Sequence, residues 1–146
     1  MRKKTIRFIA LIIVLTMLLS TVAFAATNAS AYIAATNAFI TRNGNTVEVN
    51  FWIVGTDTMD QIGVKYIYLY EKTGNTWYWV KTFSYTDPLY TNMMDTNTGA
   101  HATYVTYSGS ASKSYYASCR FYAEKDGGSD TIQQNTPTSH GTTPTP

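Results

Sequence analysis

The feature that most constrains the fold of this chain is a series of short segments in which apolar and polar residues alternate. The clearest is residues 115–124, where Cys119 and Phe121 fall on one side of an extended strand and Arg120 and Tyr122 fall on the other. No long stretch places its apolar residues at helical spacing. Alternating segments separated by turn residues are typical of an all-β fold with antiparallel strands.

Turn-forming residues divide the chain into these short segments. Hairpin turns are predicted at residues 42–45, 72–75 and 126–129, because the Asn-Gly, Gly-Asn and Asp-Gly pairs there tolerate the positive φ of tight turns. Residues 55–63 are predicted to form a loop. Neither face of residues 76–85 is cleanly apolar, so their register is ambiguous and a bulge or an edge position is favoured. The predicted strands are residues 31–41, 46–54, 64–71, 76–85, 100–108, 114–124 and 130–135, with a further short strand near residues 89–94.

The N-terminus has the parts of a secretory signal peptide. Basic residues in the first seven positions precede an apolar stretch, and residues 23–25 have the small-x-small form that signal peptidase cleaves. A membrane anchor is the alternative, because residues 8–26 are nearly long enough to cross a bilayer. Polar residues interrupt this stretch and no basic cluster follows it, so cleavage is favoured. We therefore expect a signal peptide at residues 1–25 and a secreted protein with no membrane attachment after cleavage.

The charge of the chain is concentrated in this N-terminal segment. The formal net charge of the whole chain is +2, but residues 26–146 contain 7 basic and 9 acidic residues. A surface that binds nucleic acid needs a basic face, whereas these basic residues are scattered along the sequence. The mature chain is therefore predicted to be weakly acidic and not to bind nucleic acid.

Residues that commonly carry catalysis or bind metals are few. Cys119 is the single cysteine, which excludes an internal disulfide and a multi-cysteine zinc site. Its place in an apolar stripe favours a buried thiol over a nucleophile. Of the two histidines, His140 lies in a Thr/Pro-rich C-terminal segment, which leaves only His101 for a catalytic triad. We expect no enzymatic activity, no cofactor and no metal.

Pairs of acidic residues are the remaining option for hydrolysis. Asp57 and Asp60 share one predicted loop, and Asp126 and Asp130 share a turn. Glycoside hydrolysis needs two carboxyl groups that face each other across a cleft, and a small sandwich rarely has one. These aspartates are more simply explained as turn residues, and a small hydrolase is the least favoured function.

The segment of residues 115–123 resembles a strand of fibronectin-type domains. The pattern Tyr115-x-Ala117-x-Cys119-x-Phe121-x-Ala123 looks like their strand F, with Tyr115 a candidate for the tyrosine corner. This resemblance implies an antiparallel β-sandwich of immunoglobulin or fibronectin type. About seven strands within residues 26–136 would form it.

A second resemblance covers most of residues 1–135. It rests on the signal peptide and on three short elements: residues 59–63 (Met-x-x-Ile-Gly), residues 71–77 (Glu-Lys-Thr-Gly-Asn-Thr-Trp) and residues 127–130 (Gly-Gly-Ser-Asp). Together these look like a group of small secreted proteins of uncharacterised function from clostridia-type Gram-positive bacteria. The resemblance implies secretion and the sandwich fold, and it implies no site residues.

The C-terminal segment, residues 137–146, differs in composition from the rest of the mature chain. It holds 3 of the 4 prolines of the chain together with several threonines. Such a segment has too few apolar residues to form a core. We predict that it is disordered.

Tyrosines are expected to share one outer face of the sheet. Since Ile67 and Leu69 should point inward, the tyrosines that alternate with them should point outward. In an immunoglobulin-like strand order, residues 64–71 and 114–124 are neighbours and their outward residues share a face. The candidate ligand-binding residues are Tyr66, Tyr68, Tyr70, Tyr116, Arg120 and Tyr122, with Tyr78 or Trp79 as an extension and Trp52 as a separate exposed aromatic residue.

Two functions follow from this face. Rows of tyrosines offer flat apolar surfaces with hydroxyl groups at the rim, which suits sugar rings or protein partners. The first hypothesis is therefore a secreted, non-catalytic binding module for a glycan, a cell-wall polymer or an extracellular protein. The second is a self-associating structural or matrix protein that uses the same face or an unpaired edge strand. A purely structural explanation is that the tyrosines only strengthen the sheet by cross-strand pairing.

Overall fold

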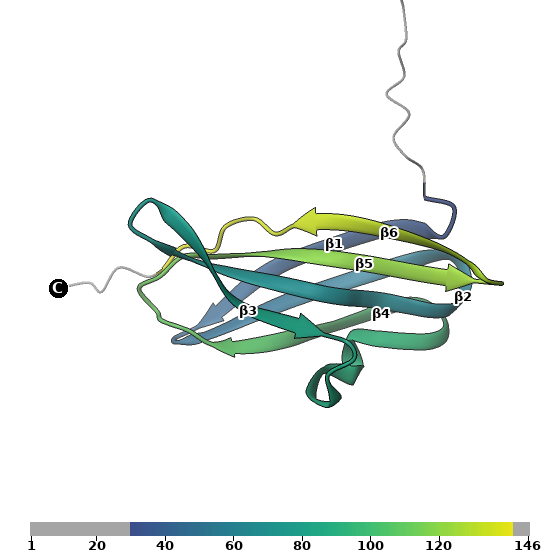
Figure 1. Cartoon of the computed structure of the whole chain (residues 1–146), viewed down its shortest axis with the longest axis horizontal. Helices are drawn as coiled ribbons and strands as arrows, with labels where there is room; N and C mark the ends of the chain where they lie inside the picture. Colours follow the sequence, from purple (N-terminus) through teal and green to yellow (C-terminus); the bar gives the residue numbers. More distant parts are fainter. Residues whose placement is uncertain (1–29, 142–146) are drawn as a thin grey trace, which may run out of the picture.

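Antiparallel strands make up most of the part of the chain that the structure describes, residues 30–141. The prediction of an all-β, antiparallel fold is confirmed. Within these residues no helix combines the length and the apolar character needed to cross a membrane. The predicted signal peptide, residues 1–25, lies outside the described residues. The computed structural model (Figure 1) contains β1 (Ile33–Asn43), β2 (Thr46–Thr73), β3 (Thr76–Ser84), the 3-10 helix η1 (Pro88–Met93), β4 (Met94–Ser108), β5 (Tyr115–Lys125) and β6 (Gly128–Asn135).

The 28-residue strand β2 connects all parts of the sheet, because it pairs with four other strands. Its first half lies between β1 and β4, and its second half lies between β5 and β3. Strand β6 continues the sheet beyond β5. The result is one six-stranded sheet that curls back on itself, so that its two halves face each other across the core (Figure 1).

The predicted loop at residues 55–63 is wrong, because these residues belong to β2. The pairing with β4 shifts register between Val54 and Met59 and then continues through Gly63 opposite Met94. The composition of this segment is typical of a turn. Residues 55–58 bulge opposite the single residue Gly99 of β4, and the pairing with β4 resumes at Met59. This continuity is one reason why the structure has six strands rather than about seven.

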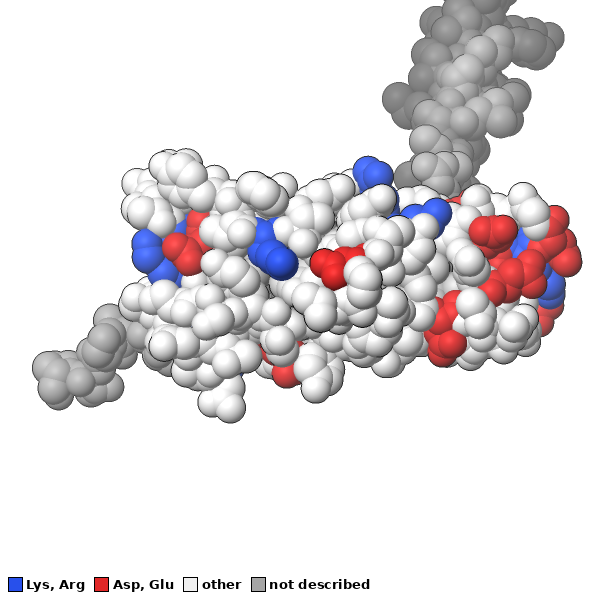
Figure 2. Space-filling model, turned by 60° about the horizontal axis from the view of Figure 1, so that its bottom comes forward, with Lys and Arg blue, Asp and Glu red and all other residues white. Residues whose placement is uncertain are grey.

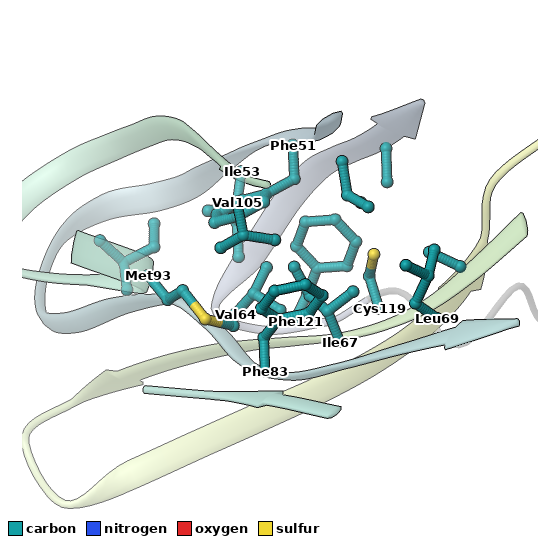
Figure 3. Close-up of a cluster of buried hydrophobic side chains, with 14 of the residues drawn as sticks. Phe51, Ile53, Val64, Ile67, Leu69, Phe83, Met93, Val105, Cys119 and Phe121 are labelled. Atoms are coloured by element: carbon teal, nitrogen blue, oxygen red, sulfur yellow. The ribbon is translucent and has the colours of Figure 1, made fainter. Parts of the chain in front are cut away.

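The core lies between the two halves of the curled sheet. Phe51 from the first half of β2 contacts Phe121 of β5, with ring centroids 6.4 Å apart and planes at 79°. Figure 3 shows that Ile67 and Leu69, from the second half of β2, point into the same space as Phe51. All these side chains are at least 98% buried, and burial of each stabilises the fold by about 1.5–3 kcal/mol. The inward faces that the alternation predicted are therefore correct.

Between β3 and β4 the chain forms the helix η1 where the sequence suggested a short strand. The Asp87 carboxylate accepts a hydrogen bond from the backbone N–H of Leu89 at 3.0 Å, and Pro88 occupies the first turn. Both features favour a helix start. Met93 is fully buried and anchors the helix to the core (Figure 3).

The pairing of β3 explains why the register of residues 76–85 is ambiguous in the sequence. Strand β3 pairs only with β2 among the described strands, and a register shift lies between Leu69 and Tyr70, so the ambiguity of residues 76–85 reflects a bulged edge strand.

After β6, Ser139 exchanges two backbone hydrogen bonds with Tyr115, at 2.8 and 2.9 Å. The Thr/Pro-rich segment, residues 137–146, thus begins by pairing with β5, and residues 142–146 lie outside the described part.

Tyr115 ties the start of β5 to neighbouring segments. Its hydroxyl accepts a hydrogen bond from the backbone N–H of Ser110 at 2.8 Å and donates to a Glu71 carboxylate oxygen at 2.5 Å. The guanidinium of Arg42 lies 4.9 Å from the ring centroid and donates to the carbonyl oxygens of Ser110 and Lys113. Burial, followed by the bond to Glu71, raises the pKa of the Tyr115 hydroxyl to about 12.

We expect glycine to be required at position 63, where β2 packs closely against the start of β4. A Cβ atom there would overlap the carbonyl oxygen of Met93 and lie 2.8 Å from Cα of Met94, at a φ of +155°. We expect Gly63→Ala to lower the free energy of unfolding by about 3 kcal/mol, measured by urea denaturation. As a control, Gly74→Asn lies in an open hairpin turn with a φ of +60° and nothing within 4 Å, and should cost well under 1 kcal/mol. Equal losses of stability in the two variants would contradict a requirement for glycine at this close contact.

The variant Tyr115→Phe tests the two hydrogen bonds of the Tyr115 hydroxyl. The variant leaves the Ser110 N–H and the Glu71 carboxylate without their partner but keeps the ring. We expect a loss of about 1–2 kcal/mol in the free energy of unfolding, measured by the same method. Tyr107→Phe is the control, because the Tyr107 ring packs edge-on at 6.3 Å from that of Tyr115 and no hydrogen bond of its hydroxyl is observed in the described chain. A Tyr115→Phe protein as stable as the wild type would show that these bonds do not stabilise the fold.

Candidate functional site

The predicted tyrosines lie together on the outer face of β2 and β5. The register places Tyr68 opposite Ser118 and Tyr70 opposite Tyr116. The rings of Tyr70 and Tyr116 stack, with centroids 4.7 Å apart and planes at 6°. We use the name tyrosine face for the surface formed by Tyr66, Tyr68, Tyr70, Tyr116, Arg120 and Tyr122 together with Trp77 and Trp79 of β3.

Strand β3 extends the tyrosine face by two tryptophans. Trp79 lies opposite Tyr70 in the pairing of β2 with β3, and Trp77 packs edge-on against Tyr116 at 4.8 Å. Trp79 is 60% exposed, although its indole N–H donates to Thr82 at 3.0 Å. Tyr78 is similarly exposed but points to the other side of the strand. Of the two alternatives that the sequence left open, Trp79 is the one that continues the face.

Tyr122 contributes less to this surface than the sequence suggests. It is only 8% exposed, because the Lys65 ammonium lies 3.3 Å from its ring centroid. Its hydroxyl donates to the Glu124 carboxylate at 2.5 Å, and this bond, followed by burial, raises the pKa of the Tyr122 hydroxyl. Arg120, by contrast, is exposed beside Tyr66.

Positive charge accompanies the aromatic rings of the tyrosine face. Lys65 covers Tyr122, and the Lys72 ammonium lies 5.8 Å from the Trp77 ring centroid. Arg120 lies on β5 between Tyr66 of β2 and Gln133 of β6. Cations that lie over aromatic rings are held by the electrons of the ring while remaining open to solvent. The face can therefore offer both flat apolar contacts and attraction for negative charge.

Acidic residues gather at the end of the molecule where β5 turns into β6 (Figure 2). There Asp57 forms an ion pair with Lys125, whose hydrogen bond holds the pKa of Asp57 below its usual value. Asp60 accepts a hydrogen bond from the backbone N–H of Asp126 at 2.8 Å. Within residues 30–141, no three acidic, histidine or cysteine side chains lie close enough to hold a metal ion. Through these contacts Asp57 and Asp60 hold the turn between β5 and β6 against β2.

A second aromatic surface lies on the outer side of the other half of the sheet. Phe39 of β1, Asn50 of β2 and Tyr104 of β4 stand opposite one another, and Trp52 lies in the next row. Phe39, Trp52 and Tyr104 are 40%, 36% and 52% exposed. They surround a shallow groove of about 290 Å³, whose lining residues are Phe39, Asn50, Phe51, Trp52, Ala102, Thr103 and Tyr104. We call this the outer groove.

Of the aromatic residues around this groove, the sequence predicts only Trp52 as exposed. The alternation within a single sequence does not say that β1 and β4 both flank the first half of β2. The three rings become neighbours only through that pairing. The outer groove and the tyrosine face point in opposite directions, because the two halves of β2 enclose the core between them.

Comparisons of this chain with models of protein families, with curated proteins and with solved structures each found no match. No residue role is therefore transferred from another protein. The two aromatic surfaces are the features from which a function can be inferred.

Cys119 lies away from both surfaces and should be chemically inert in the folded protein. It is fully buried beside Ile67, and burial raises the pKa of its thiol to about 12. At pH 8 the thiol therefore stays protonated as well as covered. We expect a thiol reagent to label the native protein at least about 100-fold more slowly than the urea-unfolded protein. Labelling of the native protein at the rate of a free cysteine would contradict this placement.

Proposed function

We propose that this chain is a secreted, non-catalytic binding module whose tyrosine face binds an acidic polysaccharide or cell-wall polymer. The observation that carries the proposal is the row of aromatic rings that crosses β3, β2 and β5 and ends in the exposed Trp79. Sugar rings stack on such flat surfaces, and tyrosine hydroxyls at the rim bind sugar hydroxyls. Lys72 and Arg120 supply attraction for carboxylate or phosphate groups.

Secretion and the type of sandwich are part of the same proposal. Secretion rests on the signal peptide predicted at residues 1–25 and on the resemblance to small secreted proteins of Gram-positive bacteria. The proposed relation to immunoglobulin and fibronectin domains is supported by the Tyr115 hydroxyl, which accepts a backbone N–H five residues upstream, as a tyrosine corner does. The two sheet halves that face each other across one core also favour it.

Trp79→Ala is the most direct test of this function. The side chain is exposed, so the variant should fold, and we expect it to bind immobilised polygalacturonate or purified cell-wall polymer at least about tenfold more weakly than the wild type. Tyr78→Ala is the matched control, because Tyr78 is 55% exposed on the same strand but points to the other side. It should bind like the wild type.

Charge can be tested separately on the same face. Arg120→Gln should weaken binding and flatten its dependence on salt concentration, since one exposed cation is lost. Binding of the acidic polymer that does not weaken as the salt concentration rises would exclude the charge contribution. Binding that survives Trp79→Ala unchanged would exclude the tyrosine face.

Self-association is the second candidate function. The free edge of β3 favours it, because this nine-residue strand pairs only with β2 among the described strands and carries exposed aromatic side chains. The bulge near Val80 and the charge of Lys81 oppose edge-to-edge pairing. Sedimentation at increasing protein concentration separates the two functions: a binding module stays monomeric without ligand, whereas a matrix protein forms larger species.

A further inference from the structure

We propose that the outer groove is a second binding site, which takes a neutral polysaccharide chain. The groove is independent of the tyrosine face, since it lies on the outer side of the opposite half of the sheet. Its aromatic rings come from three adjacent strands, β1, β2 and β4. Adjacent strands lie about 4.8 Å apart, so Phe39 and Tyr104 stand roughly 10 Å apart across β2. This separation suits alternate rings of an extended sugar chain better than one isolated sugar.

The side chains around the groove can recognise a sugar ring. Trp52 offers the largest flat surface, and its cross-strand neighbour Ala102 is small enough to leave a hollow beside it. The Asn50 amide N–H donates to Thr41 at 2.9 Å, and the Thr41 hydroxyl donates to Glu48 at 3.1 Å. These bonds orient the amide. In the described chain the Asn50 amide oxygen accepts no hydrogen bond, which leaves it open to a sugar hydroxyl.

The absence of charged residues from the lining of the groove indicates which class of ligand it suits. None of the residues that line it is charged, although Lys, Arg, Asp and Glu occur elsewhere on the surface (Figure 2). An acidic polymer would find no counter-charge in the groove, whereas a neutral hexose chain needs only ring faces and hydrogen-bonding groups. The neutral polysaccharide is thus the ligand that complements these residues.

A second copy of this chain fits the groove less well. Stable interfaces bury about 1,600 Å² in total, with 20–30 residues on each side. The groove offers seven lining residues, and its exposed rings form one compact patch. A sugar chain of a few units covers such a patch completely, which favours the smaller ligand.

The experiment is a calorimetric titration of the mature protein with soluble gluco-oligosaccharides of β-1,4 and β-1,3 linkage. We expect saturable binding, and Trp52→Ala and Tyr104→Ala should each weaken it at least about tenfold. Tyr104→Phe keeps the stacking ring and should retain most of the affinity. Leu89→Ala is the matched control, because Leu89 is 80% exposed on η1, outside the groove, and should leave binding unchanged.

The proposals for the two sites can be tested independently of each other. Trp79→Ala, on the tyrosine face, should leave binding of the gluco-oligosaccharides unchanged, and Tyr104→Ala should leave binding of acidic polymers unchanged. The proposal is overturned if the wild type binds none of the neutral oligosaccharides, or if Tyr104→Ala binds them as the wild type does. It is also overturned if Trp52→Ala converts a dimer to a monomer in sedimentation, since the groove is then a contact between copies.

Discussion

The pairing of one long strand with four others is the constraint on which the rest of this structure depends. Strand β2 has 28 residues, and its two halves belong to opposite sides of the same core. The passage from one side to the other is possible because Gly63 lets the backbone of β2 approach that of Met93 and Met94 closely. Every other strand is placed by its pairing with β2, except β6, which is placed by β5.

This arrangement separates the surface into two aromatic faces of different chemistry. The second half of β2 presents tyrosines on its outer side, and β3 and β5 add tryptophans, tyrosines and cations. The first half presents Asn50 and Trp52, and β1 and β4 add Phe39 and Tyr104 without charge in the groove.

Self-packing of the rings limits how much of each face is available to a ligand. Tyr70 and Tyr116 stack on each other, and Tyr122 is covered by Lys65, so part of the tyrosine content stabilises the sheet. Trp79 and Arg120 remain open to solvent. In the outer groove the exposed rings of Phe39, Trp52 and Tyr104 surround a shallow hollow.

The sequence by itself was sufficient for the β class, the hairpin turns, the inward faces and the burial of Cys119. These features depend on local alternation and on turn residues, which a single chain displays directly. The outward direction of Tyr66, Tyr68 and Tyr70 followed from the same period of two. The tertiary structure alone decided that residues 55–63 stay extended and that residues 88–93 form a helix. It also decided that Phe39, Trp52 and Tyr104 are neighbours, because the pairing of distant strands brings together side chains that local patterns leave unrelated.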